Sequence, residues 1–271
     1  MPLHRLDSLL VQQGIASGRD LAKAYILAGQ VCVDGRRVDK AGTMVTETAK
    51  IVFSGNPNPF VSRGGLKLAK ALDIFLINLT GRRVLDLGAS TGGFTDCALQ
   101  RGAVEVVAVD VGYGQLAWSL RNDQRVKVLE RTNARYLTLE AIGGPVDFVS
   151  ADLAFISLAK VMPVILPLLK PEADLVLLVK PQFEAGRGQV GKKGVVKDPA
   201  IHLTVVRRIA EAAQKLGLTP VDVNFSPITG PEGNIEYLLH LSNAASPVGE
   251  FPERVERAVA EAHDSLQPIW R

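Results

Sequence analysis

The sequence is poor in the residues that build cross-linked or metal-stapled folds. Its 271 residues include only two cysteines, Cys32 and Cys97, which lie far apart and form no C-x-x-C spacing. This excludes a disulfide framework and a cysteine-rich zinc site, and it fits a reducing compartment. The four histidines are scattered along the sequence, so we expect no histidine metal cluster.

Long apolar runs are also missing. The N-terminal segment MPLHRLDSLLVQQG has charges and glutamines where a signal peptide requires an apolar core. The most apolar region, residues 151–169, is interrupted by Asp152, Lys160 and two prolines. It predicts a strand and a buried helix rather than a membrane span. We therefore expect a cytoplasmic protein with neither a membrane nor a metal as partner.

The excess of positive charge is small but unevenly distributed. The net charge is +3; residues 1–60 contain seven Lys/Arg against five Asp/Glu, and residues 183–197 contain four against one. Two basic islands on an otherwise slightly acidic chain suggest a polyanionic partner. An ordinary solvated surface would have the same composition, so charge alone does not decide between the two.

A linker signal divides the chain. Residues 54–62, SGNPNPFVS, combine two prolines, two asparagines and a glycine. We predict a small module over residues 1–55, a linker over 56–62 and a large domain over 63–271.

The small module has the pattern of two helices followed by a hairpin. Leucines at positions 3, 6, 9 and 10 predict the first helix, and the second begins near Ser17, a possible N-cap, and ends at Gly29. Residues 30–38, QVCVDGRRV, place Asp34-Gly35 at the turn of a hairpin, and residues 51–53 predict a further strand.

This order resembles the S4 RNA-binding domain, an α+β fold, over nearly all of the 55 residues. The family has basic residues along its second helix and at its hairpin, which implies RNA recognition through shape and phosphate contacts. The alternative is a helical cap that only stabilises the large domain. The basic residues that match the S4 pattern are Arg5, Arg19, Lys23, Arg36 and Arg37.

The large domain alternates apolar strands with helical segments, which predicts an α/β fold with a mainly parallel sheet. Only residues 227–233 separate the last two strands, too few for a crossover, so these strands must be antiparallel. That topology is typical of Rossmann-like class I methyltransferases. Seven strands are predicted, at 83–87, 104–110, 126–130, 146–151, 175–180, 221–225 and 235–241, with helices at 93–101, 115–120, 158–169 and 199–216.

The segment LDLGASTGGFTD lies where the first strand of the large domain turns into a helix. Gly88 and Gly93 have the spacing of a phosphate-binding loop, but Phe94 occupies the position of the lysine. Asp110 ends the next predicted strand, 24 residues after Asp86, where a carboxylate binds a ribose diol. S-adenosylmethionine fits such a loop, because it has a ribose and a carboxylate but carries a sulfonium that a lysine would repel.

The same pieces could hold a nicotinamide cofactor, and Phe94 could fill the core instead of contacting a ligand. We expect Asp86 and a loop carbonyl to receive the ammonium of the cofactor. The candidate cofactor-binding residues are Asp86, Gly88, Ala89, Ser90, Thr91, Gly92, Gly93, Phe94 and Asp110.

Four charged residues stand near the ends of predicted apolar elements. Charges there are costly to bury unless they are paired, and two lysines with two carboxylates balance at one site. The residues are Lys67, Asp152, Lys180 and Glu236.

This set, in this order, resembles the lysine–aspartate–lysine–glutamate tetrad of FtsJ-like ribose 2′-O-methyltransferases. Together with the S4 pattern, DLGASTGGF and KPQFE, it is similar to the TlyA (haemolysin A) family over essentially the whole chain. The resemblance implies S-adenosylmethionine-dependent methylation of a cytidine 2′-hydroxyl in ribosomal RNA, with ribosomal subunits as partners. It also implies that Asn133 contacts the adenine and that Asp152 borders the cofactor; the alternative for Asn133 is an ordinary turn asparagine.

The chemistry of such a transfer suits the tetrad. A ribose hydroxyl is a poor nucleophile, so the enzyme must orient it and remove its proton. We predict that Lys180 is the general base and that Lys67 is a second cation that eases its deprotonation and steadies the alkoxide. Asp152 would hold Lys180 in line, and Glu236 would orient Lys67 or the ribose.

Residues 182–197, QFEAGRGQVGKKGVVK, form a glycine-rich basic segment after the predicted base. It suits a substrate-gripping loop carrying Lys192 and Lys193, or else an ordinary surface loop. Arg63 and Arg135 could also clamp RNA. Three other functions stay open: a membrane-lytic protein, a non-catalytic RNA-binding assembly factor, and a small-molecule methyltransferase.

Overall fold

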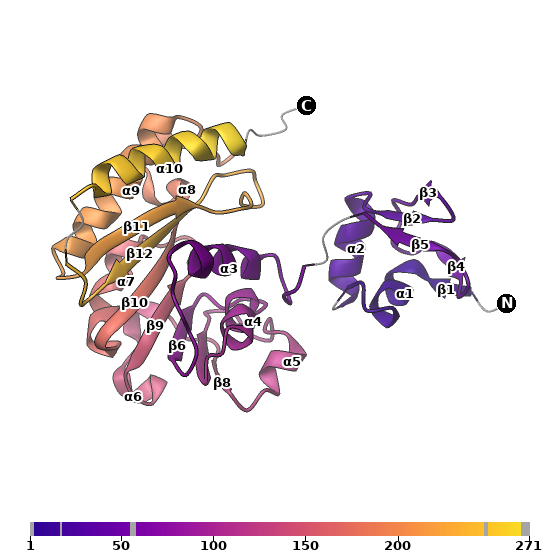
Figure 1. The fold of residues 1–271 in the computed structure, drawn as a ribbon, viewed down its shortest axis with the longest axis horizontal. Coiled ribbons are helices and arrows are strands. Elements are labelled where there is room, and N and C mark those ends of the chain that lie inside the picture. Colours follow the sequence, from indigo (N-terminus) through magenta and orange to yellow (C-terminus); the bar gives the residue numbers. More distant parts are fainter. Residues whose placement is uncertain (1–2, 17, 55–57, 247–248, 267–271) are drawn as a thin grey trace. The chain divides into compact units, whose positions relative to one another are not determined.

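The computed structural model describes residues 3–16, 18–54, 58–246 and 249–266. The chain divides into two compact units, residues 1–63 and 64–271 (Figure 1). None of the helices in these described ranges is both long and apolar enough to cross a membrane.

The first unit has two helices beside two small sheets. The predicted hairpin is confirmed, because Cys32 pairs with Arg37 and Val33 with Arg36 in antiparallel register. The return strand begins at Arg36, directly after the Asp34-Gly35 turn. The elements are β1 (Leu3–Arg5), α1 (Leu6–Gln12), α2 (Arg19–Leu27), β2 (Val31–Val33), β3 (Arg36–Arg37), β4 (Met44–Thr46) and β5 (Ile51–Phe53).

The N-terminal part of this unit differs from the predicted pattern. Leu3 was predicted in the first helix but lies in β1, where it pairs with Thr46 and is 57 % exposed, because β1 and β4 form a two-stranded sheet. Strand β4 was not predicted at all. Ser17, the expected N-cap, falls outside the described residues, and Gly18 stands at the N-cap of α2.

The second unit is built on one seven-stranded sheet. The strands run in the order β11-β12-β10-β9-β6-β7-β8, and every neighbouring pair is parallel except the two that include β12. This confirms the mainly parallel sheet with an antiparallel final pair. The strands are β6 (Arg83–Leu87), β7 (Glu105–Val109), β8 (Val126–Leu129), β9 (Val146–Ala151), β10 (Leu169–Val179), β11 (Thr219–Phe225) and β12 (Tyr237–Ser242).

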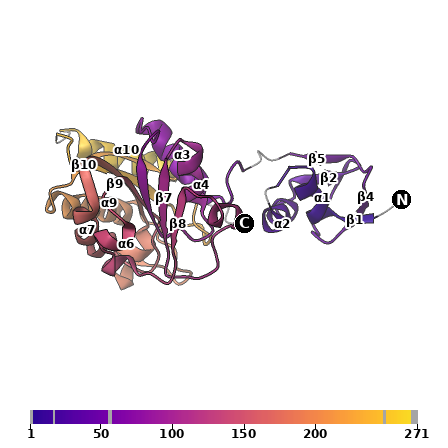
Figure 2. The same ribbon diagram turned by 90° about the horizontal axis from the view of Figure 1, so that it is seen from below.

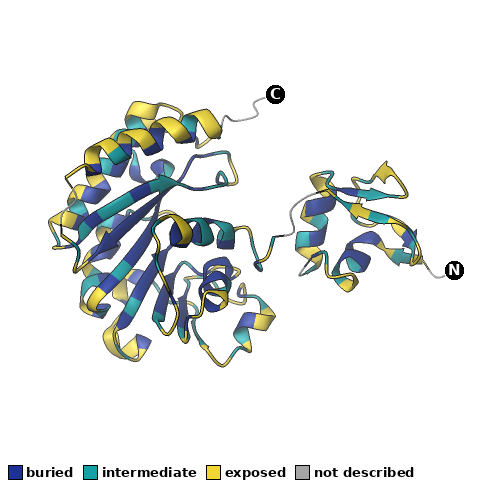
Figure 3. Ribbon diagram, viewed as in Figure 1, coloured by how far each residue is buried: buried dark blue, intermediate teal, exposed yellow. Residues whose placement is uncertain are grey.

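Helices cover both faces of this sheet. Helices α3 (Gly64–Ile74) and α4 (Gly93–Gln100) pack together on one face, and α7 (Leu158–Ile165) and α9 (Pro199–Gln214) pack on the other (Figure 2). The central strands are buried almost throughout (Figure 3). The remaining helices are α5 (Trp118–Arg121), η1 (Ala134–Tyr136), α6 (Leu139–Ile142), η2 (Leu166–Leu168), α8 (Pro181–Glu184), η3 (Arg187–Gln189) and α10 (Phe251–Ser265).

Some element boundaries differ from the predicted ones. Strand β10 begins at Leu169, six residues earlier than predicted, and its pairing with β9 is irregular between Leu169 and Asp174. The predicted helix over 158–169 therefore ends sooner, in a short 3-10 turn at Leu166–Leu168. Helix α10 was not predicted, although Val255, Val259 and Ala262 form its buried face.

Candidate active site

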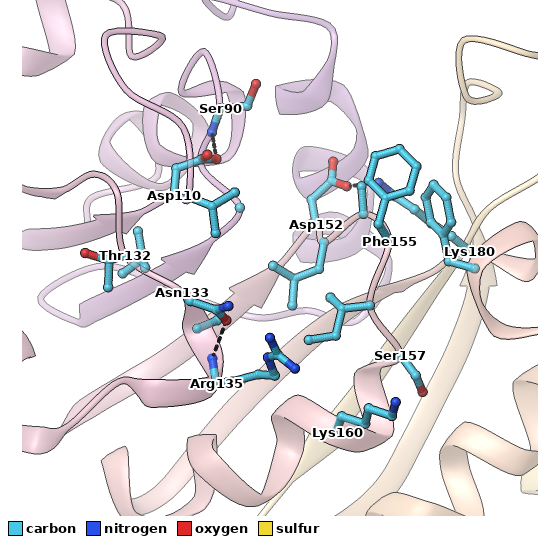
Figure 4. Close-up of a pocket in the computed structure, with 18 of the residues that line it drawn as sticks. Ser90, Asp110, Thr132, Asn133, Arg135, Asp152, Phe155, Ser157, Lys160 and Lys180 are labelled. Carbon is cyan, nitrogen blue, oxygen red and sulfur yellow. Dashed lines mark hydrogen bonds and ion pairs between the residues drawn. The ribbon is translucent and has the colours of Figure 1, made fainter.

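The carboxyl ends of the parallel strands surround a cavity of about 900 Å³ (Figure 4). Parallel strands end at one edge of their sheet, so residues that follow different strands meet there. The predicted site residues that line this cavity are Lys67, Gly88, Ser90, Asp110, Asn133, Arg135, Asp152, Lys180 and Glu236.

The four tetrad residues form a chain of ion pairs on one wall of the cavity. Lys180 Nζ lies 2.5 Å from Asp152 Oδ1, and Lys67 Nζ lies 3.7 Å from Asp152 Oδ2. Lys67 Nζ also donates to Glu236 Oε2 at 2.6 Å. The side chains of Lys67, Lys180 and Glu236 are almost nine-tenths buried or more and that of Asp152 is 21 % exposed, and the two positive and two negative charges compensate one another.

Strand register explains why residues so distant in sequence meet. Asp152 and Lys180 directly follow β9 and β10, which are parallel neighbours. Strand β12 runs antiparallel to β10, and Tyr237 pairs with Val179, so the start of β12 lies beside the end of β10. Glu236, just before β12, therefore reaches the same edge as Lys180.

The glycine loop forms a second wall. Gly88 has φ +84°, and a Cβ at this position would stand 2.3 Å from the backbone oxygen of Asp152. Only glycine allows the loop to pass this close to the end of β9. The loop and Asp152 are thus packed directly against each other.

Asp110 is held rigidly at the far end of the cavity. One carboxylate oxygen accepts a hydrogen bond from the backbone N–H of Ser90 at 2.8 Å, and the other accepts from that of Gly112 at 2.7 Å. Each oxygen retains a lone pair for a ligand. The geometry therefore suits a carboxylate that receives two vicinal hydroxyls, such as those of a ribose.

Part of the predicted loop faces away from the cavity. Phe94 is 4 % exposed, which favours its core-filling alternative. Gly92 is buried, and a Cβ there would collide with Leu120. Ala89 and Gly93 are buried as well, and Thr91 is exposed to solvent.

Asp86 is a core residue. It is fully buried, and its carboxyl oxygens accept hydrogen bonds from the hydroxyls of Thr95 at 2.7 Å and Ser150 at 3.1 Å. Burial raises the pKa of Asp86 to about 7. These contacts point inward, so the expected contact between Asp86 and a ligand's ammonium stays a prediction without geometric support.

The raised pKa of Asp86 predicts a pH-dependent stability. Between about pH 4 and pH 7 the folded protein keeps a proton on Asp86 that the unfolded chain has released, so the free energy of unfolding falls as the pH rises. Asp86→Asn is neutral at every pH and removes this slope. Above pH 7 we expect the free energy of unfolding of Asp86→Asn to exceed that of the parent by a few kcal/mol, which appears as a higher thermal midpoint. This difference in stability should shrink as the pH is lowered towards 4. Parallel pH profiles for the two proteins would contradict this.

The cavity wall also includes several residues that were not predicted from the sequence. Phe155 is 90 % exposed with φ +62°, and its ring centroid lies 4.9 Å from that of Phe183. Two further residues border the same cavity: Lys160, which lies in α7, and Ser157, which directly precedes α7. The only signal in the sequence was a phenylalanine three residues after a strand-terminal aspartate; its exposure is known from the structure alone.

Glu184, the last residue of the KPQFE motif, holds this part of the wall. It is 6 % exposed and accepts hydrogen bonds from Ser157 Oγ at 2.8 Å and from the backbone N–H of Leu158 at 2.7 Å. Glu184, which lies in α8, therefore caps the first turn of α7. Burial raises the pKa of Glu184, an effect that these hydrogen bonds oppose.

No group of three or more His, Cys, Asp or Glu side chains able to hold a metal ion was found among the residues described. The four tetrad residues of the cavity wall pair with one another.

Comparison with known proteins identifies the fold. Residues 60–243 match the model of the FtsJ-like methyltransferase family, and residues 4–51 match that of the S4 domain. The TlyA protein of Mycobacterium tuberculosis is 52 % identical over 261 residues, covering 95 % of this chain and 97 % of that protein. The chain belongs to the TlyA family of FtsJ-like methyltransferases.

Two further relatives cover nearly the full chain. A Bacillus subtilis protein, YqxC, provisionally named an rRNA methyltransferase, is 49 % identical over 267 residues, which are 97 % of this chain and 95 % of that one. A solved structure from Streptococcus thermophilus, provisionally named a hemolysin, is 41 % identical with a TM-score of 0.79 and covers 98 % of each chain. Family membership confirms the predicted fold class and the S4-type N-terminal domain.

The predicted RNA-binding residues of the S4 domain fall into two groups. Arg5 and Arg19 both pair with the fully buried Asp7, at 2.8 and 3.2 Å, and the hydrogen bond from Arg5 holds the pKa of that carboxyl well below its usual range. The side chains of Arg5 and Arg19 are about half exposed. Lys23 pairs with exposed Asp20 at 3.1 Å.

The hairpin arginines and the remaining candidates are more open to solvent. Arg36 and Arg37 are exposed, and Arg37 Nη2 donates to the backbone oxygen of Ala28 at 3.4 Å. Arg135 lines the cavity, whereas Lys192 and Lys193 border a separate hollow of about 390 Å³. Arg63 is exposed.

Proposed function

We propose that this protein transfers a methyl group from S-adenosylmethionine to a ribose 2′-hydroxyl, that of a cytidine, in ribosomal RNA. The observation that carries the proposal is the paired tetrad, which shares one cavity with a carboxylate suited to a ribose. The relative from M. tuberculosis is named a 16S/23S rRNA (cytidine-2′-O)-methyltransferase. The proposed location is the cytoplasm, where ribosomal RNA is found.

The cofactor is S-adenosylmethionine, and the residues present fit it. Asp110 would receive the ribose hydroxyls, the loop from Gly88 to Ser90 would pass close to the amino-acid part, and Asn133 would border the adenine. No lysine stands in the glycine loop to repel a sulfonium. When bound, the cofactor supplies an electrophilic methyl group.

Lys180 is the proposed general base. Its amine lies at the cavity wall, where Asp152 fixes its direction through the 2.5 Å contact. Lys67, held by Glu236, stands on the other side of Asp152 and would stabilise the alkoxide that forms as the proton leaves. Orientation and proton removal are the two tasks that this reaction demands of the protein.

The cavity mouth and the N-terminal domain favour RNA over a small molecule. Phe155 and Phe183 offer aromatic faces on which an unstacked base can lie. The S4 domain adds exposed arginines that suit phosphate contacts. The S4 domain would have no role in a small-molecule methyltransferase.

The direct test incubates the purified protein and labelled S-adenosylmethionine with ribosomal subunits and with free rRNA, then maps 2′-O-methyl groups by mass spectrometry. We expect one or a few modified cytidines, and none after deletion of residues 1–63. Transfer to small molecules alone would contradict the proposal. Liposome leakage measured with the same preparation separates methyl transfer from membrane lysis.

The S4 hairpin should contribute through charge. We expect the double substitution Arg36→Ala, Arg37→Ala to weaken rRNA binding and to lower the slope of log affinity against log salt by about 1–2. Arg101→Ala, which removes an arginine paired with Asp73 in the other domain, is the control and should leave the slope unchanged. An unchanged slope in the double variant would remove the hairpin from the RNA interface.

A further inference from the structure

The basic loop of residues 189–197 is hydrogen-bonded to the segment that carries Glu236. Asn234 is 2 % exposed and lies two residues before Glu236. Its side-chain oxygen accepts from the backbone N–H of Val196 at 3.1 Å, and its amide donates to the backbone oxygen of Gly194 at 3.0 Å. Both polar ends of one buried side chain are therefore engaged with this loop.

A second contact holds the loop from the other side. The ring of His202 is fully buried, with Nε2 3.0 Å from the backbone oxygen of Val196 and Nδ1 2.8 Å from the hydroxyl of Tyr237. Because a carbonyl only accepts, Nε2 carries the proton. Burial lowers the pKa of His202 to about 4, so the ring is neutral near pH 7. The N–H of Val196 is thus bonded to Asn234, and its carbonyl is linked through His202 to Tyr237, the residue after Glu236.

The loop separates its apolar and charged residues. Val195 and Val196 are buried, whereas Lys192 and Lys193 are exposed at the hollow of about 390 Å³. The valines anchor the loop while the lysines face outward. This arrangement suits a loop whose buried valines fix its backbone while its exposed lysines contact a polyanion.

The turn formed by residues 230–234 also supports the carboxylate of Glu236. Asn234 closes the turn through its backbone oxygen, which accepts from the N–H of Gly230 at 2.8 Å. A Cβ on Gly230 would stand 3.0 Å from Glu236 Oε1, so the carboxylate lies against this turn. Pro231, within the turn, lines the cavity.

We propose that Asn234 is a positioning residue that keeps the lysine loop in register with the Lys67–Glu236 pair. RNA bound by Lys192 and Lys193 is then held at a set distance from the tetrad, so the 2′-hydroxyl reaches the methyl group in line. The inference rests on the proposed function, since it assumes that the loop grips RNA for methyl transfer.

Replacing Asn234 by alanine should lower kcat with rRNA about 10- to 100-fold, because small misplacements of a reacting group have effects of this size. The affinity for S-adenosylmethionine, measured by calorimetry, should change less than about twofold, since the glycine loop is untouched. KM for rRNA should rise little, as the exposed lysines still attract phosphates. A merely structural role would lower the cofactor-binding fraction together with kcat.

A double-mutant cycle tests the coupling itself. Lys192→Ala, Lys193→Ala should raise KM and reduce kcat in the parent, but should cause no further loss of kcat in the Asn234→Ala background. Additive losses of kcat would overturn the proposal, as would a parent-like kcat for Asn234→Ala. If the alanine variant is unstable, Asn234→Asp replaces it, because an aspartate keeps the oxygen that accepts from the N–H of Val196. We expect this variant to lose less kcat, and the lysine substitutions to cause no further loss of kcat in its background.

Asn243 supplies a matched control at the opposite end of β12. Its side chain also bridges two backbone groups, accepting from Ala173 N and donating to Lys170 O, each at 2.8 Å. Asn243→Ala should leave kcat unchanged, and an equal loss there would refute a specific role for Asn234. If the parent itself transfers no methyl to rRNA, the proposed function fails; if the parent is active and the losses add, only the coupling fails.

Discussion

Replacing Lys180 by alanine should reduce methyl transfer to rRNA by about 10²- to 10⁴-fold, the range that a positioned general base contributes. Lys180 is 12 % exposed and pairs with Asp152 at 2.5 Å, so its amine is aimed by a fixed neighbour at the cavity. The glycine loop and Asp110 are untouched by this change. Cofactor affinity, measured by calorimetry, should therefore stay within a few-fold of the parent value.

Lys180→Arg separates the charge of this residue from its basicity. A guanidinium keeps the positive charge next to Asp152 but does not release its proton in proteins. We expect this variant to be nearly as inactive as the alanine variant while folding and binding cofactor normally. Activity within tenfold of the parent would show that Lys180 acts only through its charge and that the base lies elsewhere.

Substituting Gly88 by alanine should abolish cofactor binding at concentrations that saturate the parent protein. The left-handed backbone alone costs a residue with a side chain about 1–2 kcal/mol. In addition, the new Cβ would lie 2.3 Å from the backbone oxygen of Asp152, so the loop or the end of β9 must move. Movement of the loop would disturb the cofactor site, and movement of the end of β9 would displace Asp152 from the two lysines, so in either case activity should fall by at least about 10²-fold.

Gly81 is the matched control for this substitution. Its φ of +75° is similar, but no atom lies within 4 Å of the position of its Cβ. Gly81→Ala should lower the thermal midpoint slightly and leave cofactor affinity unchanged. Equal losses of affinity in both variants would mean that backbone strain matters, and that the close approach to Asp152 does not.

The sequence alone was enough to predict the layers and most strands of the large domain. Alternation of apolar runs with helical periodicity is a local property, so it survives without tertiary information. The short connection at 227–233 correctly required an antiparallel final pair. The same local signals failed where long-range pairing decides, as for Leu3, which pairs with Thr46, and for the early start of β10 at Leu169.

The candidate tetrad could be named from the sequence, but its geometry could not. Lys67 and Glu236 are 169 positions apart, and their 2.6 Å contact exists because β12 runs antiparallel beside β10. Asp86 shows the reverse case. Its place in the glycine motif suggested a ligand contact, whereas the structure directs it into the core towards Thr95 and Ser150.

Residue type and spacing along the chain thus predicted most elements of the large domain and named the candidate side chains for the chemistry. Tertiary structure decided which of those side chains face the cavity, because strand order and register set the direction of each one. It alone also revealed the link from Asn234 to the lysine loop, since hydrogen bonds between segments 38 and 40 residues apart leave no periodic signal in the sequence.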